Sequence, residues 1–143
     1  MRGVHVLSFL ASVHAAHPLP ESLRLTLIAP ESVAAGASVP ITLRLMNTSD
    51  RPVDVYLVGR SVTFDIVARN LSGIVVWHRL EHAVVQNILQ VRTLQPHATL
   101  EWSDVWRPEC PPGPYTLEGV LPTDGEPLRS AAKPVRIAGL TPP

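Results

Sequence analysis

The residues most able to do chemistry in this chain are dispersed rather than grouped. His78 and His82 are four residues apart, a spacing that would place two metal ligands side by side on a helix. The sequence offers them no HExxH pattern and suggests no third ligand, so we interpret both as surface histidines of a loop. The sequence also contains no GxGxxG, Walker or GxSxG pattern, which removes the usual nucleotide-binding and hydrolase signatures.

Cys110 is the only cysteine of the chain, so it has no partner for an intramolecular disulfide. A nearby cation would have to lower its pKa to make it a nucleophile, but its sequence neighbours are Glu109 and Pro111. Several carboxylates fall on predicted strands without being paired for acid–base catalysis: Asp65, Glu101 and Asp104. We therefore predict a protein that is not an enzyme and that binds neither a metal nor a cofactor.

Composition limits the partners of the chain. Its 143 residues suit one domain, and 45% of them are hydrophobic, which is enough for a packed core. Twelve basic and twelve acidic residues balance, and no basic cluster occurs, which excludes nucleic acid as a partner. No apolar run reaches the roughly 20 residues that a membrane-spanning helix needs. Composition therefore argues against nucleic acid and against a membrane span, and does not by itself identify the partner.

Strict alternation of apolar and polar residues predicts that most of the chain forms β-strands, which position the side chains considered above. Residues 79–85 break the pattern and predict a loop or one helical turn. In the run before Thr93 the alternation passes through Ile88 and Val91. Trp77, Trp102 and Trp106 fall on strands, where aromatic residues usually pack in a core. The predicted strands are Ser22–Ile28, Val39–Met46, Val53–Val58, Val62–Ala68, Ile74–His78, Gln86–Thr93, Thr99–Trp106, Tyr115–Leu121 and Pro134–Ala138.

Short strands with turn residues between them predict an all-β fold, an immunoglobulin-like antiparallel β-sandwich of about 7–9 strands. A small barrel is the alternative. The domain is expected over residues 21–138, with a leader at 1–20 and a frayed tail at 139–143. Arg2 and the apolar run Val4–Val13 outline a weak signal peptide. We expect a cytoplasmic protein, or an exported one if residues 1–16 act as that signal.

Turn residues and core aromatics recur in one order along the chain. A strand ends at Asn47 and is followed by a turn with Asp50 and Pro52, and then by Phe64 and Asp65. A hairpin with Gly73 and Trp77 comes next, then a Leu94-Gln95-Pro96 turn leading to Trp106, and a strand with Gly113, Tyr115 and Gly119. This order resembles the BsuPI domain, a family of bacterial intracellular proteinase inhibitors, over roughly residues 22–138.

Two positions depart from the pattern of that family. His97 stands where a glycine commonly follows the Leu-x-Pro turn, and Val85 stands where an aromatic residue usually precedes the glutamine, here Gln86. His97 is expected to alter its turn, because histidine tolerates a positive φ less readily than glycine does. Neither change threatens the predicted fold.

The resemblance implies an immunoglobulin-like sandwich that inhibits intracellular serine proteases of the subtilisin type, although the matched motifs contain no inhibitory loop. Prolines make Arg107–Pro114 the stiffest segment, and Arg107 or Cys110 would be the side chain that it offers. The alternative is a purely structural role, in which these prolines only shape a loop between strands. A structural or assembly module without inhibitory activity is the other function considered. The candidate protein-binding residues are Arg107, Pro108, Glu109, Cys110, Pro111 and Pro112.

Overall fold

A computed structural model of the chain describes residues 21–139, so the predicted leader and nearly all of the predicted tail lie outside the described residues. Within 21–139 the chain forms eleven strands and no helix, which confirms the all-β prediction. The two strands beyond the predicted number are the shortest, β2 and β10. The strands are β1 (Leu23–Ile28), β2 (Ser32–Ala34), β3 (Val39–Asn47), β4 (Val53–Val58), β5 (Asp65–Arg69), β6 (Val75–His78), β7 (Leu89–Leu94), β8 (Thr99–Trp106), β9 (Gly113–Leu121), β10 (Leu128–Arg129) and β11 (Lys133–Ala138).

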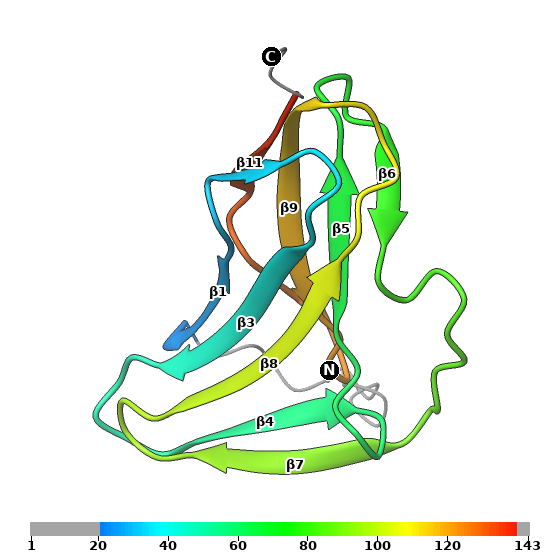
Figure 1. Ribbon diagram of the computed structural model, residues 1–143. Helices are drawn as coiled ribbons and strands as arrows, with labels where there is room; N and C mark the ends of the chain where they lie inside the picture. The colour runs from blue at the N-terminus through cyan, green and yellow to red at the C-terminus, as the bar shows by residue number, and fades with distance from the viewer. Residues whose placement is uncertain (1–20, 140–143) are drawn as a thin grey trace, which may run out of the picture.

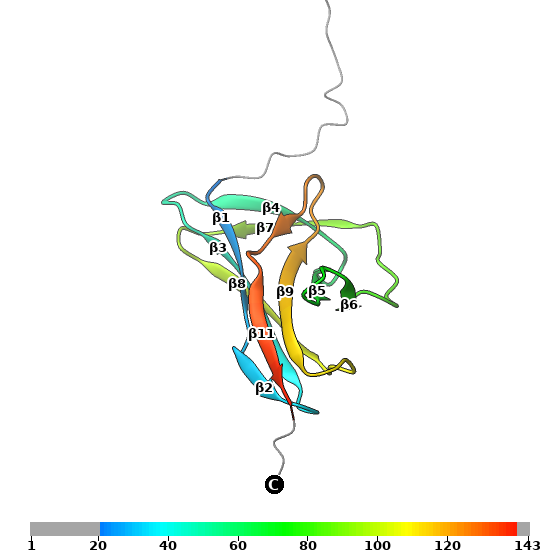
Figure 2. The same ribbon diagram turned by 90° about the horizontal axis from the view of Figure 1, so that it is seen from above.

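The strands form two facing sheets and a separate ribbon (Figures 1 and 2). One sheet has the order β1-β3-β8, and the other has the order β2-β11-β9-β5-β6, with β10 paired to β9. Strands β4 and β7 pair with each other and lie together at one end of the sandwich. The pairings are antiparallel except that β2 runs parallel to β11. This arrangement agrees with the predicted immunoglobulin-like sandwich.

The core lies between the two sheets and follows the alternation of the sequence. Strands β1 and β3 bury every second residue, and β9 does the same from the opposite sheet. Trp106 is 1% exposed; its ring stacks on Trp77 at 5.8 Å between centroids and meets the ring of Tyr115 edge-on at 5.9 Å. Trp102 stacks on Phe64 at 6.2 Å. The predicted packing role of the tryptophans is confirmed.

Gly119 of β9 faces Leu43 of the opposite sheet across the core. A Cβ atom at this position would fall 2.2 Å from Cδ1 of Leu43, which is far inside van der Waals contact. The position of the Gly119 backbone is also fixed by a hydrogen bond, since its amide donates to the Ser130 hydroxyl at 2.8 Å. Only glycine therefore fits this position of the strand.

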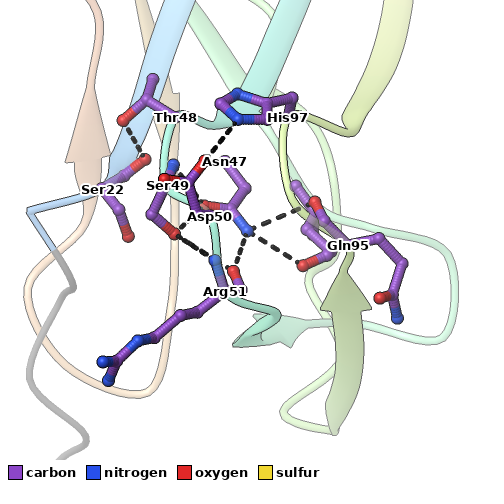
Figure 3. Close-up of polar contacts among 9 residues, drawn as sticks. Ser22, Asn47, Thr48, Ser49, Asp50, Arg51, Gln95 and His97 are labelled. Atoms are coloured by element: carbon purple, nitrogen blue, oxygen red, sulfur yellow. Dashed lines mark hydrogen bonds and ion pairs between the residues drawn. The ribbon is translucent and has the colours of Figure 1, made fainter.

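Two turns at one end of the sandwich are joined by the buried side chain of Asn47 (Figure 3). Its Nδ2 donates to the carbonyl oxygens of Arg51 at 2.7 Å, Leu94 at 3.1 Å and Gln95 at 3.3 Å. Its Oδ1 accepts from the amide of Ser49 at 3.0 Å. One amide thus ties the β3–β4 turn to the β7–β8 turn, which explains the asparagine at the end of β3.

His97 occupies the second of these turns with φ of 59°, the left-handed conformation. The turn is therefore one that favours glycine, and the histidine adopts it at a cost in free energy rather than avoiding it. Its Nε2 lies 2.9 Å from Oδ1 of Asp50, across from the β3–β4 turn (Figure 3). Both side chains are exposed, so this contact offsets little of the cost.

The second half of the chain departs from the predicted strand limits. Strand β5 begins at Asp65 rather than Val62, and β7 begins at Leu89 rather than Gln86. The predicted alternation of this strand included Ile88 and Val91 as apolar positions. Their side chains are 39% and 53% exposed. The reason is that β7 pairs only with β4 among the described strands, and no second layer covers its outer face.

Candidate protein-binding surface

The proline-rich loop, Arg107–Pro112, connects β8 of one sheet to β9 of the other and is tied to the body of the domain. The Tyr115 hydroxyl donates to the carbonyl oxygen of Pro111 at 2.5 Å. The hydroxyl thus bonds back to the chain four residues upstream, the arrangement called a tyrosine corner in related sandwiches. The Cys110 side chain, which bonds the phenol, and burial together raise the pKa of Tyr115 to about 12.

Some side chains of the proline-rich loop are exposed to solvent, and others are partly buried. Cys110 is half-buried and packs against the hydrophobic core. Arg107 and Glu109 are exposed, as are Pro111 and Pro112. Of the two side chains that the sequence suggests for presentation, Arg107 is thus the one that faces solvent.

A hollow of about 290 Å³ joins the proline-rich loop to the edge of the second sheet. Strand β6 forms that edge, since it pairs only with β5 among the described strands. The hollow is lined by side chains from three segments: Val76 and Trp77 of β6, Glu81 of the following loop, and Trp106, Arg107, Glu109 and Cys110. These segments therefore form one continuous surface.

The loop that follows β6, residues 79–88, is called here the β6–β7 loop. It contains turns at its start, where the amide of Glu81 donates to the carbonyl of His78 and that of Ala83 to Leu80. Of the two alternatives that the sequence left open, a loop or one helical turn, the structure has the loop. Figure 1 shows it standing out at the side of the molecule.

Arg79 fastens the beginning of the β6–β7 loop. Its Nε lies 2.6 Å from Oδ2 of Asp104 on β8, and its Nη1 donates to the carbonyl of Phe64 at 2.8 Å. The guanidinium carbon also lies 3.7 Å from the centre of the Phe64 ring, a cation–π contact. One side chain thus connects the loop to both sheets.

Asp65 provides a second attachment at the same end. Its Oδ1 accepts from the amide of Leu80 at 3.0 Å, and its Oδ2 lies 3.1 Å from Nδ1 of His78. Phe64 and Asp65 are residues on which the family resemblance rests. Their place in the structure shows that they position the start of the β6–β7 loop.

The far end of the β6–β7 loop is fastened to the turn after β4. The amide of Gly59 donates to the carbonyl of Ile88 at 2.6 Å. Nε2 of Gln90 donates to the carbonyls of Gly59 at 2.5 Å and Arg60 at 2.9 Å. Gly59 has φ of 96°, and a Cβ there would lie 2.5 Å from the carbonyl oxygen of Ser61, so glycine is needed at this attachment.

Between its two attachments the β6–β7 loop has few contacts. Val84 is 95% exposed, the most of any large hydrophobic side chain in the described residues, and Val85 is 46% exposed. A hollow of about 260 Å³ separates this part of the loop from Val62 and Thr63. Sequence reasoning missed these residues as a candidate contact; the available signal was an apolar Ala83-Val84-Val85 run inside a segment without strand alternation.

The histidines and carboxylates of the described residues do not gather into a metal-binding cluster. Among residues 21–139, no group of three or more His, Cys, Asp or Glu side chains could hold a metal ion. His78 ends β6 and faces Asp65, while His82 lies in the loop with its Nε2 3.4 Å from Oε2 of Glu81. The two histidines thus face different carboxylates. No helix of the described residues is long and apolar enough to cross a membrane.

The fold and this surface define an all-β domain whose exposed features are loops fastened at their ends. The family model described as "Intracellular proteinase inhibitor", BsuPI, matches residues 27–126, and the chain belongs to this family. The matched residues include both the β6–β7 loop and the proline-rich loop. No curated protein sequence matches the chain.

The solved structures found to be similar share only 10–12% sequence identity with this chain. The C-terminal domain of wzt has a TM-score of 0.52 at 10% identity, with 85% of this chain and 75% of that one covered. The alkylpurine DNA glycosylase AlkC of Pseudomonas fluorescens, bound to DNA containing an abasic site analog, has a TM-score of 0.45 at 12% identity, and β-glucosidase from Listeria innocua has 0.45 at 10%. Each of the latter two matches covers 82% of this chain, which spans only 30% of the glycosylase and 16% of the glucosidase.

Proposed function

We propose that this domain inhibits a subtilisin-type serine protease inside the cell by binding to the protease and blocking access of substrates. The observation that carries the proposal is the family match over residues 27–126, whose description is an intracellular proteinase inhibitor. The domain acts by binding alone and performs no catalysis itself. Loops that are fastened at both ends suit this role, because little conformational freedom is lost when they bind.

The proline-rich loop is proposed as part of the contact with the protease. Its prolines restrict the backbone, and the bond from Tyr115 to Pro111 holds its C-terminal half against the core. Arg107 is exposed at its start and lines the hollow beside β6. An exposed arginine at the rim of a contact surface would steer the encounter and contribute modestly to affinity.

The direct test is a titration of the full chain against a subtilisin-type protease from the same cell, with hydrolysis of a small peptide as the signal. Stoichiometric loss of protease activity is expected. A metalloprotease titrated in parallel serves as the control and should remain active. Unchanged hydrolysis by the subtilisin-type protease, with the domain intact or digested, would contradict the proposal and favour a structural or assembly module.

The contribution of Arg107 is tested by reversing its charge. Arg107→Glu should weaken inhibition by about tenfold, in line with a charged residue at the rim of an interface. Arg24→Glu is the matched control, because Arg24 is also exposed but lies on β1, in the other sheet from β6. If Arg107→Glu inhibits as well as the unmodified chain, the proline-rich loop is not part of the contact.

The proposed location is tested by the mass of the native protein. An N-terminus that retains residues 1–16 in a cytoplasmic fraction is the expected result. Cleavage near Ala15 or Ala16, with the product outside the cell, would contradict an intracellular target.

A further inference from the structure

We infer that Val84 of the β6–β7 loop enters the apolar side-chain-binding pocket of the target protease, with the neighbouring main chain bound as an extended segment. This inference rests on the proposed inhibitory function and identifies the contact that function requires. It also gives the partner a chemistry: a protease whose specificity pocket accepts an aliphatic side chain.

The first observation is the exposure of Val84. Its side chain is 95% exposed, and it lies in Ala83–Ile88, a stretch without a charged residue. Burial of such a side chain in an apolar pocket is favourable, because apolar surface is removed from water. A single exposed valine is ordinary on a protein surface. This one is distinguished by the loop on which it stands.

The second observation is that both ends of the loop are fixed while its centre is not covered. Arg79 and Leu80 are bonded at one end to Asp104 and to the Phe64–Asp65 segment. Ile88 is bonded at the other end to Gly59. The centre is therefore presented at a fixed place on the surface, so binding costs less conformational entropy than for a loop without such attachments.

The third observation concerns the main chain of the loop. Residues 83–88 belong to no strand or helix, and the main-chain groups of Val84 and Val85 bond no other described residue. Such unpaired amide and carbonyl groups can pair with an exposed strand edge of a partner if the segment becomes extended on binding. A substrate cleft that binds extended peptides offers such an edge. The loop is thus able to occupy the cleft as a substrate does.

The two loops of this surface have different chemistry, which decides between them. A pocket that received Arg107 would need a carboxylate at its base, whereas a pocket that receives Val84 must be apolar. The exposed aliphatic side chain of Val84 therefore points to a partner whose pocket is apolar. Glu81 of the β6–β7 loop and Arg107 line the same hollow, so the start of the β6–β7 loop lies beside the proline-rich loop.

The test compares Val84→Asp with Leu71→Asp in the full chain. Leu71 is the matched control because it is 83% exposed and stands in the turn between β5 and β6. A carboxylate in an apolar pocket is strongly unfavourable, so Val84→Asp should raise the inhibition constant by at least about 100-fold. Leu71→Asp should leave it within about twofold, and Val84→Leu within about tenfold. The thermal midpoints of all three variants should match that of the unmodified chain.

The outcomes separate this inference from the proposed function. If the unmodified chain inhibits and Val84→Asp inhibits equally, the inference is overturned while the inhibitory function stands. Equal losses in Val84→Asp and Leu71→Asp also overturn it, because the effect would then not depend on the place of the charge. If the unmodified chain inhibits no subtilisin-type protease, both the function and the inference fail.

Discussion

The Arg79 Nε lies 2.6 Å from Oδ2 of Asp104, and this ion pair joins the start of the β6–β7 loop to β8 in the opposite sheet. The same guanidinium bonds the carbonyl of Phe64 and lies over its ring. Arg79 therefore combines three contacts at the place where the loop leaves β6. The position of the loop depends on this side chain more than on packing, because a hollow lies beneath the loop.

Replacing Arg79 by alanine should weaken both inhibition and the stability of the fold. We expect an inhibition constant about tenfold higher. Without this attachment the loop is more mobile in the free domain, so it loses more conformational freedom when it binds. The free energy of unfolding should fall by about 1–2 kcal/mol, because the pair is only partly buried and solvent screens it. Inhibition titrations and urea unfolding of the same samples measure the two effects.

The control for Arg79 is Arg44→Ala. Arg44 forms an ion pair of similar length with Glu101, 2.5 Å from Nε to Oε2, between β3 and β8. Both side chains are more than 40% exposed and lie away from the β6–β7 loop. This change should alter neither inhibition nor stability appreciably. Equal inhibition by Arg79→Ala and Arg44→Ala would show that the stem of the loop does not matter.

Asn47→Ala should be among the most destabilising single changes. It removes the donor shared by three carbonyl oxygens and leaves buried polar groups without a partner, at a cost of about 2–4 kcal/mol. Asn70→Ala is the matched control, since Asn70 makes only exposed turn bonds to Ser72 and Ile74. Urea unfolding should show a clearly smaller loss for Asn70. A loss of similar size at both positions would contradict the role given to Asn47.

His97→Gly should stabilise the domain. The left-handed conformation costs a residue with a side chain about 1–2 kcal/mol, and glycine avoids this cost. Glycine also has more conformational freedom in the unfolded chain, which reduces the gain in stability by about 0.5–1 kcal/mol. The expected gain is about 0.5–1 kcal/mol, read as a higher thermal midpoint. His82→Gly, in the exposed β6–β7 loop, should give no such gain. A lower midpoint for His97→Gly would mean that the contact with Asp50 is worth more than its exposure indicates.

The sequence predicted those elements whose burial follows a simple period. Thr99–Trp106 is a strand with the limits that alternation indicated. Alternation did not predict the exposure of Val91, because the pattern of one strand does not say whether a second layer covers it. The family pattern marked Gly119 without giving the reason, which is the approach of Leu43 from the facing sheet.

The candidate surface was only partly predictable for a related reason. Prolines restrict the backbone, so the stiffness of the loop Arg107–Pro112 could be predicted from residue types alone. The β6–β7 loop has no such marker, since its attachments come from Gly59, Phe64, Asp65 and Asp104, which are distant in the sequence. Its importance becomes visible only when the fold brings these residues together.

The last prediction concerns Tyr115 and alkaline pH. The unfolded chain loses the phenolic proton near the usual pKa of 10.0, whereas the folded domain keeps it to about 12. Between these values the unfolded state binds fewer protons than the folded state, so stability falls as pH rises. The contribution is fully present below pH 10, and its loss by pH 12 amounts to about 2–3 kcal/mol.

Tyr115→Phe should remove this part of the pH dependence. At neutral pH the variant should be less stable by about 1–2 kcal/mol, because the carbonyl of Pro111 loses its donor. From pH 10 to 12 the difference from the unmodified domain should shrink and then change sign, since phenylalanine does not ionise. Cys110→Ala is the companion variant: it should lower the pKa of Tyr115 toward 10, because the Cys110 side chain is the largest cause of the shift. Urea unfolding across this pH range measures both effects, and parallel curves for Tyr115→Phe and the unmodified domain would refute the assignment.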